Sequence, residues 1–363
     1  MSQRNVPQGS NPTISRRSLL AWAALTPLTL PFGCEGPKPL AQNGRVPTRP
    51  PPSKISTATT VGDRTSPPAQ CVPELLPFGT EVPFNEKDRA FEADSDQFEQ
   101  KRRRKPGDWL ERFSETGLNF DEYVASRPTG RRGQRCVLVL QPLGTFSPAE
   151  RTQLSELVAF TSVYFDTKVR VAPALVPPKR GQRVRQDGGK HWVQHHTQTI
   201  LNWLADRHLP ADAVCLLGIT MDDLYPEPAW NYVFGEATLE KRVGVYSLAR
   251  YAARFWGEPE NPQSRRLQVL RSFKVLAHET GHMFSLSHCR RYECLMNGSN
   301  SLEEMDRAPL EPCPVCLKML QYNLRFDIRS RYRRLMDLYE HNGLHSESDW
   351  VKARLERIGC GNV

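Results

Sequence analysis

The sequence predicts an α/β fold in which strands and helices alternate along the chain. Three apolar runs have the length of buried strands, at residues 136–141, 169–176 and 213–219. A helix is expected after the first run, because serine caps a helix, proline suits its first position and an acid suits its first turn. These residues are Ser147, Pro148 and Glu150. A second helix is expected over residues 192–207, with apolar side chains at Ile200, Leu201, Trp203 and Leu204.

The segment after the third strand predicts an edge strand and then a long helix. In residues 230–234 large apolar side chains alternate with polar ones, and Gly235 follows, which suits a strand at the edge of a sheet. Residues 264–284 predict the long helix. Its expected buried face consists of Leu267, Leu270, Phe273, Leu276 and Ala277. Residues 316–339 predict one further helix.

The long helix ends in an H-E-x-x-H motif that predicts a metal site. Residues four apart share one face of a helix, so the imidazoles of His278 and His282 can bind one ion. Glu279 lies about 100° round the helix, within reach of a metal-bound water. A third nitrogen is available from His288 only if the helix ends near Ser285 and the chain folds back. Three protein ligands with an open fourth position are typical of a catalytic zinc.

Four cysteines after these histidines predict a second metal site. They are Cys289, Cys294, Cys313 and Cys316. Four thiolates complete the coordination of zinc, which is typical of a structural site. Successive side chains of an extended segment point to opposite sides, so the neighbours His288 and Cys289 can bind different ions. The sequence therefore predicts two zinc ions per chain, one catalytic and one structural.

This stretch resembles the archaemetzincins, metallopeptidases of the metzincin clan. Their signature is H-E-x-x-H-x-x-G-x-x-H-C-x4-C-x-M followed by C-x-x-C, and the chain matches it at the three histidines, Glu279, the four cysteines and Met296. The resemblance extends upstream to residues 222–226, 232–235 and 243–247, and covers roughly residues 135 to 340. It implies a metzincin-like zincin domain with a mixed twisted sheet, an active-site helix and a C-terminal helical subdomain stapled by the four-cysteine zinc.

The resemblance also implies roles for residues outside the ligand sets. Met296 corresponds to the methionine of the Met-turn, an apolar floor under the three-histidine site; a core methionine is the alternative. The predicted edge strand lies above the zinc and pairs with an extended peptide. Its candidate substrate-binding residues are Trp230, Tyr232 and Phe234. A half-buried edge strand without a ligand is the alternative.

The chain departs from the family pattern at Ser285, where the family places glycine. Glycine reaches positive φ at little cost, whereas serine is strained there. We expect the metal site to form, and leave open whether the activity is reduced. The first hypothesis is zinc-dependent hydrolysis of peptide bonds in a peptide or protein substrate, with Glu279 as the general base. The alternative is a zinc-stabilised binding or scaffold module whose three-histidine site has drifted.

The N-terminus predicts export. Residues 15–20 resemble a twin-arginine signal, and the apolar stretch at residues 19–32 is too short to span a bilayer comfortably. We expect a periplasmic or cell-envelope protein, with a cytoplasmic location as the alternative. Residues 30–34 also resemble a lipoprotein box, but lipidation of Cys34 as a membrane tether is disfavoured because proline and phenylalanine fill the small-residue positions.

The composition indicates one folded core and additional segments that are not part of it. The chain has 363 residues, 39% hydrophobic residues and 30 prolines. We expect an export signal at 1–34, a Pro/Ser/Thr-rich linker at 35–83, a charged extension at 84–134 and a catalytic domain at 135–363. Whether the extension covers the cleft is left open, as is the oligomeric state. A disulfide framework is disfavoured, with Cys71 and Cys360 as the pair left open.

The remaining charged and polar clusters are expected to be structural. The formal charge of +9 comes largely from basic runs such as 101–105 and 329–334. Acidic residues lie among them and no nucleic-acid motif accompanies them, so a solvated surface is favoured over nucleic-acid binding. His191, His195 and His196 are expected to face solvent rather than form a third metal site. Asp222 and Asp223 are expected in a loop held by side-chain to backbone hydrogen bonds.

Overall fold

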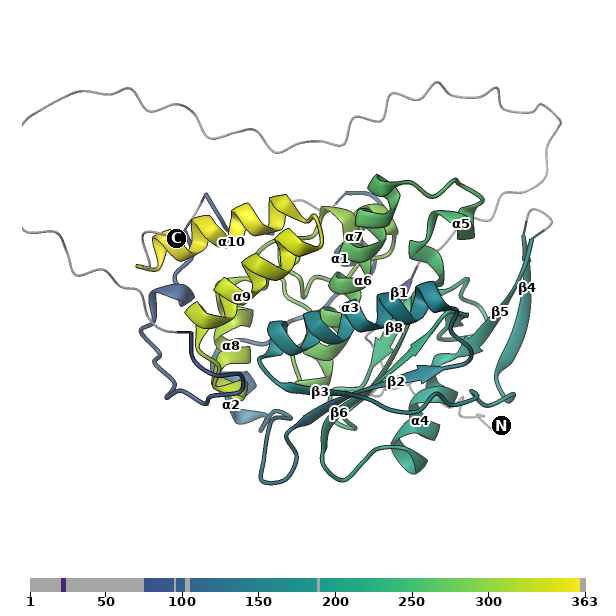
Figure 1. Ribbon diagram of the computed structural model, residues 1–363, viewed down its shortest axis with the longest axis horizontal. Helices are drawn as coiled ribbons and strands as arrows, with labels where there is room; N and C mark the ends of the chain where they lie inside the picture. The colour runs from purple at the N-terminus through teal and green to yellow at the C-terminus, as the bar shows by residue number, and fades with distance from the viewer. Residues whose placement is uncertain (1–20, 24–74, 95, 102–104, 188–189, 360–363) are drawn as a thin grey trace, which may run out of the picture. The chain divides into compact units, whose positions relative to one another are not determined.

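The computed structural model describes residues 21–23, 75–94, 96–101, 105–187 and 190–359, which fall in one compact unit (Figure 1). The twin-arginine residues, the lipoprotein box at Cys34, most of the linker, Cys71 and Cys360 lie outside the described residues. Every helix in the described part of the chain is too short or too polar to cross a membrane.

A mixed sheet forms the centre of the described chain, in the order β3-β2-β6-β9-β8-β7-β5-β4 with β1 paired to β8. The strands are β1 Ala21–Ala23, β2 Val137–Leu143, β3 Lys168–Val171, β4 Gln182–Asp187, β5 Lys190–His196, β6 Ala213–Thr220, β7 Asp223–Tyr225, β8 Val233–Ala237 and β9 Val243–Ser247. β2 is parallel to β3 and β6, and β8 is antiparallel to β9. The predicted α/β class is therefore confirmed.

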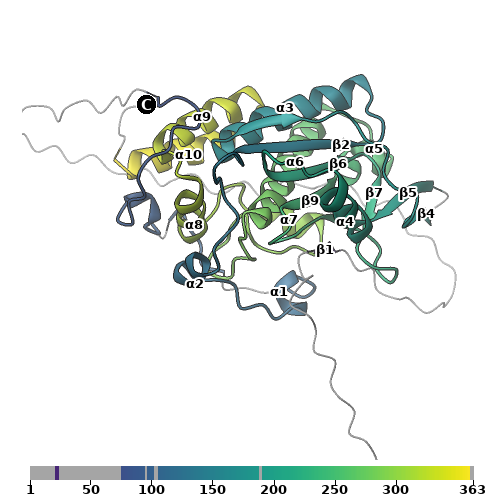
Figure 2. The ribbon, with the colours of Figure 1, turned by 90° about the horizontal axis from the view of Figure 1, so that it is seen from below.

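Helices cover both faces of this sheet (Figures 1 and 2). α3 and α6 pack on one face, where Leu138 and Leu140 of β2 join their hydrophobic cluster, whereas α4 packs with Val139 on the other. The helices are η1 Arg89–Phe91, α1 Trp109–Arg112, α2 Phe120–Ala125, α3 Pro148–Phe165, α4 Thr197–Arg207, η2 Ala249–Tyr251, α5 Ala253–Trp256, α6 Pro262–Met283, α7 Leu302–Arg307, α8 Pro314–Leu324, α9 Ile328–His341 and α10 His345–Arg357.

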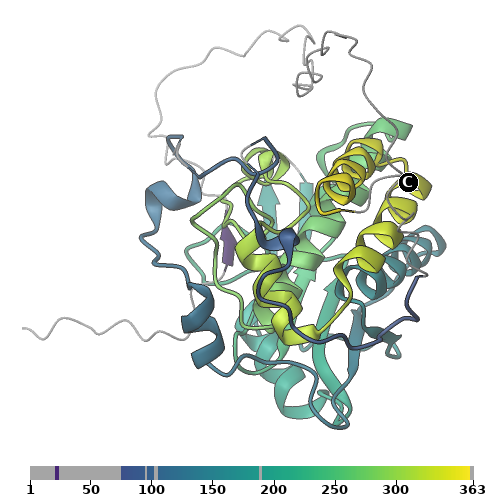
Figure 3. The same cartoon turned by 90° about the vertical axis from the view of Figure 1, so that its left-hand side faces the viewer.

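The N-terminal extension and the C-terminal helices lie on the same side of the described unit. The extension, drawn in blue in Figure 3, runs past the yellow-green C-terminal helices. Its elements η1 and α2 both contact α8, and α10 packs on α9. Residues far apart in the sequence thus pack together, since η1 and α2 precede the sheet and α8 follows it.

Several predicted elements are confirmed with small shifts at their ends. The first and third strands are β2 and β6, and α3 begins at Pro148 with a capping box between Ser147 and Glu150. The long helix is α6, whose N-cap is Asn261. The second strand is shorter than expected, since β3 ends at Val171. On α6, Leu267 is exposed rather than buried.

Three expectations about secondary structure are wrong. The helix expected from residue 192 begins at Thr197, because the five residues before it belong to β5, which pairs with β4 and β7. The single helix expected over 316–339 is two helices, because Arg325 takes a left-handed φ of 57° and Asp327 caps α9. The segment 230–234 is not an edge strand, since β8 begins at Val233 and lies between β9 and β7.

The basic run at 329–334 is not uniformly solvated, which corrects another expectation. Arg331 is 1% exposed, and its guanidinium donates to the Tyr164 carbonyl oxygen and the Glu311 carboxylate. Arg329 and Arg334 form ion pairs with Asp88 and Asp166. The arginines of this run therefore join α9 to the core and to the extension.

Candidate metal centres

The active-site helix ends where the sequence predicts a break. α6 stops at Met283, and Ser285 takes the left-handed backbone with φ of 67°. The Ser285 hydroxyl donates to the Leu239 carbonyl oxygen at 2.8 Å and accepts from the Thr129 amide at 3.1 Å. A strained serine thus takes the backbone conformation expected of glycine, and two hydrogen bonds of its side chain hold it there. The chain reverses after it, which brings His288 back to the helix.

Three imidazoles converge at this reversal. The ligand nitrogens of His278, His282 and His288 all lie within 4.8 Å of one another, and all three residues are buried. The Nε2 atoms of His278 and His282 are 2.8 Å apart. The structure therefore places the three histidines named from the sequence at one point.

The hydrogen bonds of these rings show that a cation fits between them. The Nδ1 atoms of His278 and His282 lie 2.9 and 2.6 Å from the carbonyl oxygens of Leu295 and Leu286, which can only accept hydrogen bonds. Burial lowers the pKa of both imidazoles well below the ordinary value, so both are neutral and carry their single proton on Nδ1. Their Nε2 lone pairs therefore face each other, and a metal ion held by both rings would remove the repulsion.

Glu279 follows His278 on α6, and both of its carboxylate oxygens are unpartnered. Its side chain is buried, and neither Oε1 nor Oε2 has a hydrogen-bond partner. Burial, together with the charge of Glu236, raises the pKa of Glu279 well above its ordinary value. A nearby cation opposes this effect and favours the carboxylate. The arrangement therefore suits a base next to a metal ion.

The four cysteines form a separate cluster next to the histidines. Their sulfurs lie within 4.8 Å of one another, all four residues are buried, and none is in a disulfide. The amides of Met296 and Cys313 donate to the Cys294 sulfur at 3.4 and 3.1 Å. Hydrogen bonds from the other three thiols lower the pKa of Cys289. Four converging sulfurs with amide donors fit zinc, and the neighbours His288 and Cys289 serve different clusters, as predicted.

Met296 packs under the histidine-bearing turn of α6. The residue is 1% exposed, and a Cβ added at Gly281 would come within 2.6 Å of the Met296 sulfur. Gly281 lies between His278 and His282 in the sequence, so the methionine contacts the backbone that carries both rings. This position agrees with an apolar floor beneath the site.

The candidate substrate-binding residues differ in how far they are buried. Trp230 and Tyr232 are partly buried, but Phe234 is 1% exposed and packs against Tyr251 in the core. Tyr232 stacks on the Arg250 guanidinium at 3.4 Å. The side chain of Phe234 is therefore not available to a substrate, whereas Trp230 and Tyr232 are each partly exposed.

Two further expectations about polar clusters are corrected. His195 is 1% exposed rather than solvent-facing, and its Nε2 lies 2.8 Å from Asp222. Asp223 begins β7, and its carboxylate accepts hydrogen bonds from the buried Arg250 guanidinium at 2.8 and 2.6 Å. In the described part of the chain His191, His195 and His196 form no ligand cluster. These groups tie β5, β7 and η2 together.

The extension supplies residues that sequence reasoning missed. The carboxylate of Glu115 lies 2.9 Å from His288 Nδ1, and the Trp109 ring packs edge-on against the His288 ring at 5.1 Å. Phe113 stacks on Trp230 with ring centroids 6.3 Å apart. No local signal marks these residues, since a single carboxylate in a charged segment is ordinary. The sequence leaves open whether the extension covers the cleft. The contacts with His288 show that the extension borders the histidine site.

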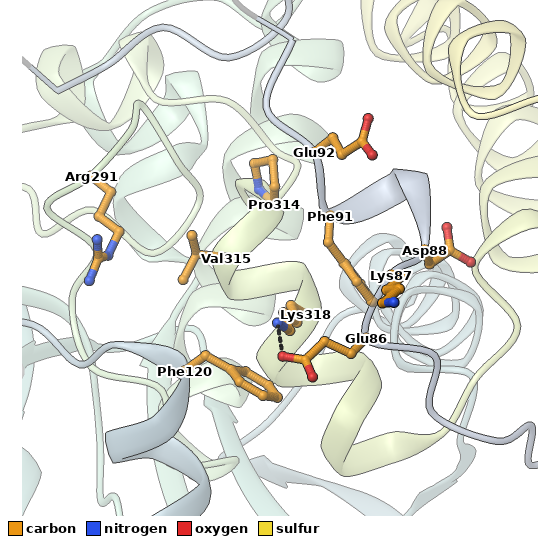
Figure 4. A pocket seen from close by; sticks show the side chains of 10 residues that line it. All are labelled: Glu86, Lys87, Asp88, Phe91, Glu92, Phe120, Arg291, Pro314, Val315 and Lys318. Atoms are coloured by element: carbon orange, nitrogen blue, oxygen red, sulfur yellow. Dashed lines mark hydrogen bonds and ion pairs between the residues drawn. The ribbon is translucent and has the colours of Figure 1, made fainter.

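Two cavities lie along the extension. One of about 720 Å³ is bordered by residues that include Gly117, His288, Cys289 and Cys316. The other, of about 620 Å³, lies between η1 and α8, where Glu86 and Lys318 form an ion pair at 2.8 Å (Figure 4). Its lining includes none of the three histidines and not Glu279, so it is separate from the candidate catalytic site.

Comparison with known proteins identifies the family. The chain is 33% identical over 290 residues to Archaemetzincin-2 of Homo sapiens, an alignment covering 72% of this chain and 79% of that protein. This chain belongs to the archaemetzincin family. The profile of Peptidase family M54 matches residues 181–322, which include both ligand clusters. The chain is therefore a zinc metallopeptidase, as the resemblance implied.

Further archaemetzincins are similar over smaller spans. Archaemetzincin-1 of Homo sapiens is 32% identical over 255 residues, which cover 63% of this chain and 51% of that protein. The crystal structure of archaemetzincin from Methanopyrus kandleri has a TM-score of 0.43 and 30% identity, covering 54% of this chain and 99% of that one. The structure from Archaeoglobus fulgidus, complexed with malonate, has a TM-score of 0.39 and 28% identity, covering 50% and 99%.

Proposed function

We propose that His278, His282 and His288 hold a catalytic zinc and that Glu279 is the general base and acid of peptide-bond hydrolysis. The observation that carries this proposal is the convergence of three buried imidazoles beside a carboxylate with no hydrogen-bond partner. Zinc bound there would polarise the scissile carbonyl and lower the pKa of a water. Glu279 would take a proton at its carboxylate as the water oxygen bonds to the carbonyl carbon, and would deliver it to the leaving amine as the C–N bond breaks.

The substrate is a peptide or protein whose backbone pairs with β8. In support, β7 pairs with β8 only at Val233 in the described chain, and β1 runs antiparallel to β8 with Ala21 opposite Glu236, so β8 accepts an extended segment beyond the end of β7. Gly235 of β8 lies against Glu279, so a strand added here runs close to the base. Trp230, stacked with Phe113, then contacts a side chain of the peptide.

The four-cysteine cluster holds a second, structural zinc. Its sulfurs come from two places, the segment after His288 and the start of α8. Zinc there joins the loop that carries the third histidine to the C-terminal helices. Each chain therefore holds one catalytic and one structural zinc.

Export through a twin-arginine signal agrees with these metal sites. This route carries folded proteins, so the thiolates of Cys289, Cys294, Cys313 and Cys316 would bind zinc in a reducing cytosol before export to the periplasm or cell envelope. The proposal rests on Arg16 and Arg17 and the apolar stretch after them. Fractionation of cells that express wild type and an Arg16→Lys, Arg17→Lys double variant tests it.

The test of catalysis is Glu279→Gln. Purified variant and wild type are compared for zinc content and for turnover of a peptide library. We expect equal zinc content and a loss of turnover of about 10²-fold or more, because the amide cannot accept the proton. Glu156→Gln is the matched control, since Glu156 forms an ion pair with Arg265 near the start of α6, at the other end of the helix from the histidines, and the change should keep activity within a few-fold. Equal peptide cleavage by Glu279→Gln and wild type would remove Glu279 from the mechanism.

The alternative, a zinc-stabilised binding or scaffold module, differs from the enzyme in peptide turnover. It rests on Ser285, and this residue takes the backbone conformation expected of the glycine it replaces. The alternative would be supported by zinc at both clusters without turnover of any peptide in a wide library.

A further inference from the structure

His288 is contacted on the side away from the other histidines by a carboxylate of the extension. Both oxygens of Glu115 lie 2.9 Å from His288 Nδ1. The two side chains are 17% and 1% exposed, so the contact is largely shielded from water. Glu115 lies 173 residues before His288 in the sequence, which makes this a tertiary contact rather than a local one.

The contact determines which nitrogen of His288 carries a proton. A carboxylate accepts hydrogen bonds, so Nδ1 next to Glu115 is the protonated nitrogen. His288 Nε2 is buried and has no hydrogen-bond partner, and it is the nitrogen that remains for the other two histidines and the metal. His278 and His282 are oriented in the same way, but by neutral backbone carbonyls. His288 thus differs from them in having a carboxylate partner.

Several contacts hold Glu115 and the segment around it in place. The Arg290 guanidinium donates to the Glu115 carbonyl oxygen. Gly117 takes a φ of 66°, and a Cβ there would come within 3.2 Å of the His288 carbonyl oxygen, so the two backbones approach closely. Trp109 packs on the His288 ring, and its amide donates to the Glu304 carboxylate at 3.0 Å. The extension therefore encloses His288 on this side.

We propose that Glu115 is a positioning residue for the catalytic zinc, which makes the N-terminal extension a working part of the active site. A carboxylate on the outer nitrogen of a histidine ligand fixes the ring and makes the inner nitrogen a better donor to the metal. Glu115 acts through His288 and does not itself contact the metal. This inference rests on the proposed role of His288 as a zinc ligand.

Zinc affinity tests the inference without measuring peptide cleavage. Full-length wild type, Glu115→Gln and Glu115→Ala are titrated with chelators of graded affinity, so that release from the histidine and cysteine clusters is followed separately. We expect both variants to bind zinc at the histidines about 10- to 100-fold more weakly, with the cysteine cluster unchanged. Cobalt substituted at the histidines should show a shifted visible spectrum in Glu115→Gln, because the donor strength of His288 falls.

Asp108→Asn is the matched control. Asp108 forms an ion pair with Arg307 at 2.7 Å, which ties the same segment to α7 without contacting His288. The control should keep wild-type zinc affinity. Wild-type affinity in both Glu115 variants, or an equal loss in Asp108→Asn, would overturn the inference. Glu115-dependent affinity without peptide turnover would leave the inference standing and contradict the proposed function alone.

Discussion

Gly235 and Glu279 are in such close contact that a side chain at residue 235 has no room. A Cβ placed on Gly235 would lie 2.7 Å from Glu279 Oε1 and 2.9 Å from Cδ. Gly235 is in β8 and Glu279 is on α6, so the contact joins the strand proposed to pair with the substrate to the proposed base.

Gly235→Ala should displace Glu279 and lower peptide turnover by an order of magnitude or more while zinc stays bound. The three atoms nearest to the added methyl group all belong to Glu279. Turnover and zinc content of the purified variant are the measurements. Gly218→Ala is the control, because its Cβ would meet Leu143 and Leu204 at 3.0 and 3.1 Å, on the other face of the sheet. Wild-type turnover in Gly235→Ala would show that the position of Glu279 is not critical.

Ser285→Ala should destabilise the protein more than Ser285→Gly. Alanine keeps the strain of a positive φ and loses both hydrogen bonds of the hydroxyl, a loss of about 2 kcal/mol. Glycine loses the same bonds but relieves about 1 kcal/mol of strain, so its net effect is about 1 kcal/mol. Free energies of unfolding from urea titrations of the zinc-loaded proteins measure the difference. The reverse order would mean that Ser285 is not strained.

Cys313→Ser should remove the structural zinc and greatly lower the thermal midpoint of unfolding. Cys313 begins the turn into α8 and its sulfur is 3.6 Å from that of Cys289, next to His288. Loss of this ion should therefore also weaken zinc binding at the histidines. Calorimetry and metal analysis check both effects, with the exposed Cys136→Ser as control. An unchanged midpoint would exclude a structural ion.

The free energy of unfolding should fall between pH 5 and pH 8 because Glu236 is buried. Burial raises its pKa to about 7 from 4.5, so its contribution to stability is complete below pH 4.5 and is lost as the pH rises through about 7. The upper bound of the loss is about 3 kcal/mol. Unfolding of wild type and Glu236→Gln at pH 5 and pH 8 measures it, and the variant should lose less stability between the two. Parallel losses would mean that the carboxyl ionises freely in the folded protein.

The sequence predicts those parts of the site that depend on local spacing. Helical periodicity places His278 and His282 on one face, and the need to bring His288 back predicts the break at Ser285. The capping pattern at Ser147 predicts the start of α3, which is confirmed. In each case the residues that interact are near one another in the chain, so their spacing in the sequence is enough to predict the contact.

The features that were missed depend on contacts between distant segments. The sequence of β5 favours a helix, because the pairing of this strand with β4 and β7 is tertiary and leaves no local pattern. Arg331 was assigned to the surface because its buried partner Glu311 has no recognisable spacing from it. Glu115 was missed for the same reason, since nothing near it in the sequence marks a partner of His288.

The zinc content of wild type and of His288→Ala shows whether the three histidines share one metal ion. We expect two zinc ions per wild-type chain, one at each ligand cluster, and a loss of one ion in the variant while the four thiolates keep theirs. Equal zinc content in the two proteins would contradict the claim that the three histidines share a metal ion.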